Sequence, residues 1–328
     1  MDSFLFALGA VMPIVLMVSL GFCLKAIGIL PKEIIKPLNK IVFRVFLPIL
    51  LFLNIYKISD FGDLSFGYII YMTVAITVIF LISFPLSAIL TKDRRRRAVL
   101  IQSSFRSNCA LIGLPLSVSL VGDAGAAAVS LLSAVSIPLF NILAVIALTV
   151  YDPSGRKPTV GKVLLGIVKN PLIIGVALGL VALGARQAFV ALDIDFRLSD
   201  ITPIYSVIND LSKCATPIAL LALGAQFEFS SVKNMKMEII SGTLMRTLIF
   251  PLICIGVALF LIPGLEPAHY AAYVGVFATP LAVSTVPMAQ EMGSDEELAG
   301  QLVIWTTIAS AFGIFLFTFL MKLLGAFG

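Results

Sequence analysis

Two hydrophobic stretches of this sequence are interrupted by proline and small polar residues, the residue types that open a membrane helix to a ligand. The first, 105–125, reads FRSNCALIGLPLSVSLVGDAG, and the second, 277–297, reads FATPLAVSTVPMAQEMGSDEE. In each stretch a proline (Pro115 or Pro287) precedes an aspartate by eight residues. Proline removes a helical hydrogen bond, and the freed backbone groups and helix N-termini hold anions. Interrupted segments at matching places in two halves predict a transporter's binding site.

The candidate substrate-binding residues are the polar, glycine and proline residues in and beside these stretches. Small and hydroxylated side chains let helices approach closely and supply hydrogen bonds. Membrane helices also contain glycine and proline for packing alone, so the paired placement is what distinguishes these positions. The set comprises Arg106, Ser107, Asn108, Gly113, Pro115, Asn141, Thr279, Pro280, Ser284, Thr285, Pro287 and Gln290.

Four basic residues lie inside predicted membrane segments: Arg44, Arg106, Lys213 and Arg246. Only one acidic residue, Asp210, clearly lies inside such a segment. A charge in the bilayer is costly, so such residues usually face a cavity, and an excess of cations there predicts an anionic substrate. Two alternatives stay open. Arg44 and Arg106 are near enough to a helix end to snorkel, and Asp210, one turn away, can neutralise Lys213.

Other chemistry finds little support in the sequence. We find no nucleophile–base pair, metal-ligand cluster or phosphate loop, and therefore expect no enzyme activity, cofactor, metal or ATPase subunit. The run DRRRR at 93–97 is interpreted as a topology signal and anionic-lipid anchor, not a nucleic-acid site. Ser294 and Glu297 have the capping-box spacing that starts a helix.

The composition requires a bilayer around these residues. The 328-residue chain is 59% hydrophobic and 12% charged, whereas soluble domains carry about 25% charged residues. A hydrocarbon core needs about 20 apolar residues per helix, and continuous runs favour helices over barrel strands. Ten segments are predicted: 4–24, 36–56, 66–90, 98–120, 125–149, 168–188, 203–224, 238–262, 270–291 and 298–324.

Lysine and arginine are distributed unequally between the connecting loops. Alternate loops hold 15 of them, and the opposite loops hold only Lys57, Arg186, Arg197 and Lys322. The positive-inside rule places the basic loops in the cytoplasm. We therefore expect a bacterial inner-membrane protein with both termini extracytoplasmic.

A hydrophilic break at 151–171 divides the chain into 1–150 and 172–328, with five segments in each part. Because five is odd, the second set enters the membrane in the opposite orientation. The predicted fold is therefore an all-α polytopic membrane protein of two inverted five-helix repeats. The fourth and ninth segments are the two interrupted ones.

Arg106-x-Asn108, followed by IGLPL at 112–116, resembles the motif of the auxin efflux carrier family. Further similarity lies in LPILLF at 47–52, NPLII at 170–174, PIALLALG at 217–224, Pro280-x-Ala282, Gly293-x-Asp295, Thr306-Thr307 and Ser310. The chain lacks the long cytoplasmic loop of the plant carriers, so the resemblance implies the fold and not auxin as the substrate.

The resemblance implies an elevator-type carrier. The first, second, sixth and seventh segments would form a scaffold that dimerises. The third to fifth and eighth to tenth segments would form the transport unit, with the substrate held where the broken segments cross. In the family, the asparagine seven residues before the proline contacts a substrate carboxylate, and here that residue is Asn108.

We therefore expect a secondary transporter of a small organic anion, a mono- or dicarboxylate. The alternative is an anion channel or a substrate-sensing membrane receptor on the same scaffold. A carrier saturates and shows counterflow, whereas a channel does not. Asp210 is the candidate for proton coupling.

Overall fold

The computed structural model describes residues 2–57, 66–152, 160–262 and 264–327, and these are almost entirely helical. Within those ranges the only β-type pairing is an isolated bridge between Ser107 and Leu281. Shorter apolar helices, Met12–Ala26 and Leu111–Val121, accompany the long ones. Among the described residues, seven helices are long and apolar enough to cross a membrane: Glu33–Tyr56, Gly67–Leu90, Asp123–Val150, Pro171–Ala191, Thr202–Gln226, Val232–Leu261 and Glu296–Leu323. The chain is a polytopic membrane protein.

All ten predicted segments are helical over most of their length. The part before the hydrophilic break forms α1 (Asp2–Ala26), α2 (Lys32–Ile41), α3 (Leu47–Tyr56), α4 (Phe66–Leu90), α5 (Arg94–Phe105), α6 (Leu114–Val121) and α7 (Asp123–Val150). The rest forms α8 (Val160–Lys169), α9 (Pro171–Ala191), α10 (Thr202–Gln226), α11 (Lys236–Leu244), α12 (Phe250–Leu261), α13 (Pro267–Tyr273), α14 (Thr285–Glu291) and α15 (Glu296–Leu323). The short helix α8 lies within the predicted hydrophilic break. The two broken segments are α5–α6 and α13–α14.

Four short π-helical turns widen these helices, and each ends two residues before a proline. They are η1 (Val42–Phe46), η2 (Cys109–Gly113), η5 (Met245–Ile249) and η6 (Val274–Ala278), which precede Pro48, Pro115, Pro251 and Pro280. A proline ring clashes with the carbonyl four residues earlier and lacks an N–H. A wider turn removes the clash, and such turns often mark functional sites. Two of the four turns lie in the broken segments.

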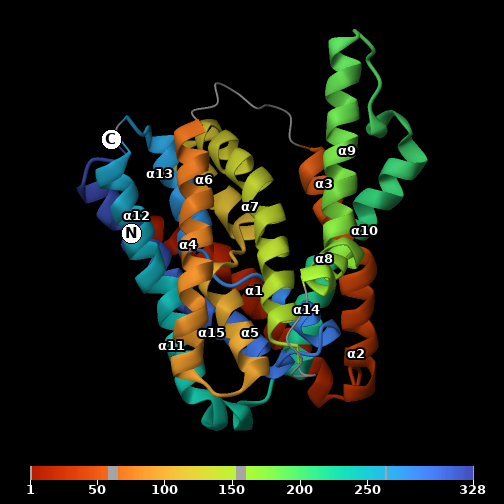
Figure 1. Ribbon diagram of the computed structural model, residues 1–328, viewed down its shortest axis with the longest axis vertical. Helices are drawn as coiled ribbons and strands as arrows, with labels where there is room; N and C mark the ends of the chain where they lie inside the picture. Colours follow the sequence, from red (N-terminus) through yellow and green to blue (C-terminus); the bar gives the residue numbers. More distant parts are fainter. Residues whose placement is uncertain (1, 58–65, 153–159, 263, 328) are drawn as a thin grey trace.

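The helices form two groups, which Figure 1 shows side by side. The α2, α3, α9 and α10 helices stand together on the right, and α4, α11, α12 and α13 stand on the left. In the first group α3 packs along α9, and α10 packs along α1. A Cβ on Gly175 would strike the backbone of Pro48, and one on Gly224 would strike the backbone of Val18. Both pairs therefore pack backbone against backbone.

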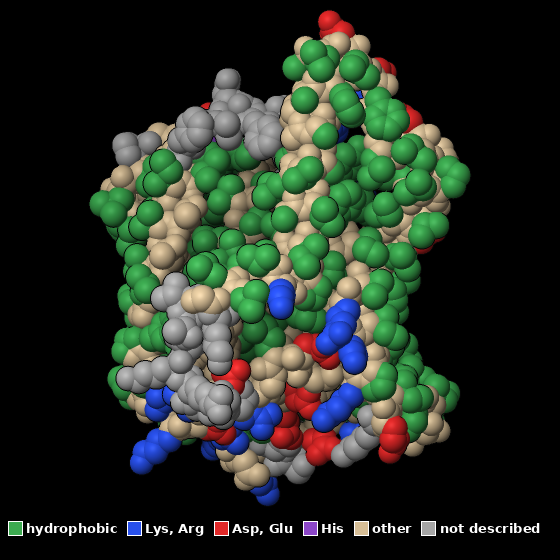
Figure 2. Space-filling model, turned by 45° about the vertical axis from the view of Figure 1, so that its right-hand side comes forward, with side chains coloured by type: hydrophobic (Ala, Val, Ile, Leu, Met, Phe, Trp, Pro, Cys, Tyr) green, Lys and Arg blue, Asp and Glu red, His purple; other side chains and the backbone are tan. Residues whose placement is uncertain are grey.

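Charged side chains gather at one end of the molecule, below a wide hydrophobic belt (Figure 2). The α2 helix and the turn that leads into α5 contribute the exposed basic residues Lys36, Lys40, Lys92 and Arg94 to this end. These belong to the loops that the positive-inside rule assigns to the cytoplasm. We call it the basic end, and the side on which Lys57 lies the opposite end.

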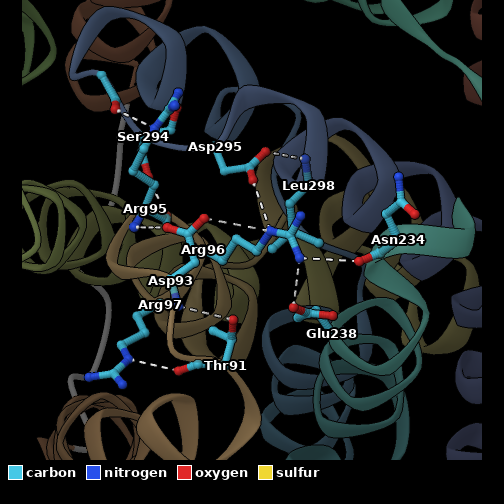
Figure 3. A network of polar contacts seen from close by, with 11 residues as sticks. Thr91, Asp93, Arg95, Arg96, Arg97, Asn234, Glu238, Ser294, Asp295 and Leu298 are labelled. Atoms are coloured by element: carbon cyan, nitrogen blue, oxygen red, sulfur yellow. Dashed lines mark hydrogen bonds and ion pairs between the residues drawn. The ribbon is translucent and has the colours of Figure 1, made fainter. Parts of the chain in front are cut away.

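The start of α5 is bound to the starts of α11 and α15 by its arginines (Figure 3). Arg96 donates from Nη1 to Glu238 at 2.9 Å and from Nε to Asp295 at 3.2 Å. Arg95 donates to the carbonyls of Gly293 and Ser294. These two guanidinium groups therefore bind protein partners, and the interpretation of the basic run as an anionic-lipid anchor stays a prediction.

Helix α15 begins differently from the sequence prediction. Asp295, not Ser294, caps it, because the Asp295 carboxylate accepts a hydrogen bond from the Leu298 backbone N–H at 2.9 Å. Ser294 instead donates its hydroxyl to the Arg95 carbonyl at 2.7 Å. The capping box predicted with Glu297 is wrong, because the contact with α5 takes the serine hydroxyl away from the helix end.

Candidate functional site

The two broken segments meet where each leaves its helical path. Ser107 and Leu281 form an antiparallel bridge, and the Asn108 backbone N–H donates to the Pro280 carbonyl at 2.9 Å. The Ser107 hydroxyl lies 2.6 Å from that of Thr279. The pairs Ser107–Thr279 and Asn108–Pro280 are each 172 positions apart, the same separation as that of the two matched prolines. Residues that the sequence pattern aligns with one another are therefore in contact.

Two glycines let the segments cross at this point. A Cβ on Gly113 would lie 2.7 Å from the Gly275 carbonyl oxygen, and one on Gly275 would lie 3.1 Å from the Gly113 Cα. Gly113 was predicted for the site, and Gly275 was not. Its only sequence signal is its position five residues before Pro280, within the π-turn η6. Both are packing residues of the crossing.

Arg106 is 2% exposed and carries four side-chain contacts. Nη1 donates to Gln102 at 3.1 Å and contacts the Met288 sulfur at 2.8 Å. Nη2 donates to Asn141 at 2.9 Å and to Ser284 at 3.0 Å. A continuous helix would point Arg106 and Asn108 in nearly opposite directions. The chain is instead extended at Arg106, with ψ of 113°, and both residues line the same cavity.

Asn108 presents an unused hydrogen-bond donor. The residue is 6% exposed, and its side-chain Nδ2 has no partner among the described residues. Its backbone N–H is already bound to the Pro280 carbonyl. A buried amide nitrogen without a partner is costly, and a ligand acceptor in the cavity removes that cost.

The cavity at the crossing has a volume of about 130 Å³. Five of the predicted residues line it: Arg106, Ser107, Asn108, Asn141 and Ser284. The facing wall comes from α3, α9 and α10 and is largely aliphatic. Two neutral polar residues of that wall, Asn54 and Thr216, were missed. Asn54 had a signal, as the one amide within the run LPILLFLNIY, whereas Thr216 only adjoins Pro217.

Arg246 lies behind the crossing and not in the cavity. It is 2% exposed and donates to the Thr279 carbonyl at 2.9 Å and to the Val276 carbonyl at 3.1 Å. These carbonyls end the first half of the broken segment, where a helix dipole places partial negative charge. Arg246 therefore stabilises the break. Within the described part of the chain, neither Arg246 nor Arg106 forms an ion pair.

The remaining predicted binding residues do not line the cavity. Thr279 and Pro280 belong to the crossing itself, and Thr285 and Pro287 are buried at the start of α14. Pro115 is exposed at the start of α6.

Gln290 faces α2 instead of the cavity. It accepts a hydrogen bond from Asn39 at 2.9 Å and donates to the Lys36 carbonyl at 3.1 Å. It therefore joins the two helix groups near the basic end. Across the described ranges, no group of three or more His, Cys, Asp or Glu side chains is placed to hold a metal ion.

Like Arg246, the other three charged candidates lie outside the cavity. Arg44 is 59% exposed and forms an ion pair with Glu291 at 3.0 Å. Asp210 and Lys213 are both exposed and lie 3.7 Å apart on α10. This ion pair agrees with the alternative considered from the sequence, in which Asp210 neutralises Lys213. The apolar sequence around these residues suggested burial, but they lie on outer helix faces.

The site has a neighbouring cavity on each side along the molecule. One, of about 210 Å³, shares Asn54 and Ile137 with the site and is also lined by Lys57. The other, of about 500 Å³, is lined by Arg44, Glu291 and Asn170 and shares no residue with the site. The cavity at the crossing therefore shares lining residues with the neighbouring cavity on the Lys57 side and shares none with the cavity on the Arg44 side.

Two comparisons with known proteins cover nearly the whole chain. A family model described as membrane transport protein matches residues 6–318. An uncharacterized transporter of Methanothermobacter thermautotrophicus is 22% identical over 320 residues, and the similarity covers 92% of this chain and 93% of that protein. Both matches include the two broken segments and the helices that surround them.

Proposed function

Because the chain belongs to the auxin efflux carrier family of membrane transport proteins, it is a membrane transporter, and we propose that it carries a small organic anion. The observation that carries this proposal is the pairing of Arg106 with Asn108 in one buried cavity. Among the described residues, Arg106 has no carboxylate partner for its positive charge, and the Asn108 side-chain nitrogen has no acceptor. An anion with oxygen acceptors supplies both missing partners.

The mechanism that we propose is elevator-type alternating access. The broken segments, with α7, hold the charged and most of the polar residues of the cavity, and α3, α9 and α10 form its facing wall. Movement of the broken segments and α7 along α3, α9 and α10 carries the anion between the two ends of the molecule. The same proposal includes a bacterial inner membrane, extracytoplasmic termini and a homodimer formed through the scaffold helices. The chain is not proposed to bind ATP or nucleic acid.

The test is counterflow in proteoliposomes. Vesicles loaded with an unlabelled carboxylate should accumulate the labelled form transiently above its outside concentration, and uptake should saturate. Asn108→Ala should weaken the apparent affinity roughly ten- to a hundredfold, because a hydrogen bond to a charged group contributes about 1.5–3 kcal/mol. Asn209→Ala, at an asparagine on α10 outside the cavity, is the matched control. Flux without saturation or counterflow identifies a channel instead, and binding without flux identifies a receptor.

A further inference from the structure

We infer that the cavity selects a short monocarboxylate with an apolar tail and discriminates against dicarboxylates of the same length. This inference rests on the proposed function and narrows its substrate class. It follows from three properties of the cavity: its single charge, the separation of its polar and apolar walls, and its size.

The cavity has one charged side chain in its lining, Arg106. Its terminal nitrogens are already engaged by Gln102, Met288, Asn141 and Ser284. The guanidinium therefore supplies charge at a fixed place more than it supplies free donors. Together with the unpartnered Nδ2 of Asn108, it defines one position for one carboxylate.

The facing wall is suited to a hydrocarbon chain. Leu47, Leu50 and Leu51 of α3 line it, with Leu172 of α9 and Ala215 of α10. A second carboxylate placed against these side chains loses its water and gains no cation. Burying a charge without a partner is strongly unfavourable, whereas a methylene or methyl group placed there is favourable.

The neutral polar residues of that wall do not alter this conclusion. Asn54 and Thr216 can hydrogen-bond a keto or hydroxyl group, but neither carries a charge. Lys57 lines the adjoining cavity, and its Nζ donates to the Asn209 side chain at 3.4 Å. It therefore stands at the approach to the site and not opposite Arg106.

The size of the cavity limits the tail. At about 130 Å³ it is below the roughly 300–1,000 Å³ of sites for drug-sized ligands. The favoured ligands are therefore acids of a few carbon atoms, with or without a keto or hydroxyl group.

The experiment compares pentanoate, glutarate and pentanamide, which share a five-carbon chain and carry one, two and no carboxylate groups. Each is added to the purified protein in detergent, and binding is measured by calorimetry and by the shift in thermal unfolding temperature. We expect pentanoate to bind at least about tenfold more tightly than glutarate, because the second carboxylate is desolvated without a partner. Pentanamide should bind more weakly than pentanoate, because it lacks the charge that Arg106 attracts.

A second cation on the apolar wall should reverse the preference. Thr216→Lys and, separately, Leu50→Lys place an ammonium group on that wall, and either should improve glutarate relative to pentanoate. Lys57→Met is the control and should leave the ratio unchanged. Size-exclusion profiles and thermal unfolding establish that each variant is folded.

The outcomes separate this inference from the proposed function. Glutarate binding as tightly as pentanoate, or more tightly, overturns the monocarboxylate inference and leaves anion transport standing. If neither acid binds, and no other short carboxylate from one to six carbons does, the anion function itself is wrong. A reversal of preference in the lysine variants, with Lys57→Met unchanged, supports the assignment of the facing wall.

Discussion

Arg106 contributes to the site as a fixed positive charge held in place by its neighbours. Its guanidinium contacts Gln102, Met288, Asn141 and Ser284, and these come from α5, α7 and the second broken segment. A single side chain therefore joins three parts of the fold around the cavity. An arginine keeps its charge at neutral pH and presents its donors as a rigid planar group, so both properties matter at this position.

This double role gives a prediction for charge and geometry at Arg106. Arg106→Gln should reduce carboxylate uptake at least about tenfold, because the cavity loses its only charge in a medium of low dielectric constant. Arg106→Lys should retain part of the uptake, because it keeps the charge but loses the planar set of donors. The measurement is initial uptake into proteoliposomes. Wild-type uptake in the Gln variant would show that Arg106 only holds the fold together.

The sequence could predict the polar side of the cavity but not the facing wall. Arg106 and Asn108 are recognisable because a basic residue and an amide interrupt an apolar run before a proline. Thr216 and Gly275 are not recognisable, because a threonine and a glycine are ordinary residues of membrane helices. Their roles depend on which helix lies opposite, and this is a property of tertiary packing.

At the scale of elements, α2 and η1 hold α14 near the basic end. Arg44 pairs with Glu291 at 3.0 Å, and the buried Asn39 donates to Gln290 at 2.9 Å. A half-exposed ion pair contributes about 0–1 kcal/mol, and a buried amide hydrogen bond about 1 kcal/mol. Both contacts join α14 to the other helix group near the basic end, so we expect them to close the cavity at the crossing toward that end.

Breaking these contacts should open the cavity toward the basic end. The reporter is Cys109, which lines the cavity and is 1% exposed, in a background with the other three cysteines changed to serine. Asn39→Ala combined with Arg44→Ala should increase its labelling by a thiol reagent added from that side. A loss of about 1–2 kcal/mol corresponds to roughly a five- to thirtyfold higher open population.

The reversed pair provides the control for this experiment. Arg44→Glu with Glu291→Arg, in the presence of Asn39, should label as slowly as the parent protein, because the ion pair is retained. Equal labelling of the double-alanine variant and the parent would mean that these contacts do not close the cavity.

The crossing of η2 and η6 gives a prediction about stability. Gly113→Ala should lower the free energy of unfolding by about 1–3 kcal/mol, because an added Cβ forces two backbones apart. Gly256→Ala on α12 is the matched control, because a Cβ there meets nothing within 4 Å and alanine favours helices over glycine. Thermal unfolding in detergent measures both. A Gly113→Ala variant as stable as the control would show that the crossing is loosely packed.

The helices themselves were largely predictable, and their interruptions only in part. Runs of apolar residues locate each helix, because the hydrocarbon core sets its length. The prolines locate the breaks approximately. The extended chain at Arg106 was not predictable, because it depends on the pairing of Ser107 with Leu281 in a distant segment. The cap of α15 was misassigned for the same reason, since Ser294 binds α5.

At the scale of the whole molecule, the charged end and the hydrophobic belt define an axis across the bilayer (Figure 2). Cysteines introduced at the exposed positions Lys40 and Lys57 test its direction in a cysteine-free background. In intact cells, a membrane-impermeant maleimide should label Lys57→Cys and leave Lys40→Cys unlabelled, because basic loops stay in the cytoplasm. The reverse labelling pattern would show that the protein has the opposite orientation in the membrane.

The division of the cavity between its two walls has a consequence for the energy of movement. The groups that we propose bind the anion, Arg106, Asn108 and Ser284, all belong to the broken segments, whereas the wall from α3, α9 and α10 is mostly leucine and alanine. In the proposed elevator motion the anion would therefore keep its polar partners from one end of the molecule to the other. The facing wall offers few hydrogen-bonding groups, so movement along it would break few hydrogen bonds. The aliphatic wall therefore keeps the energy barrier to sliding low.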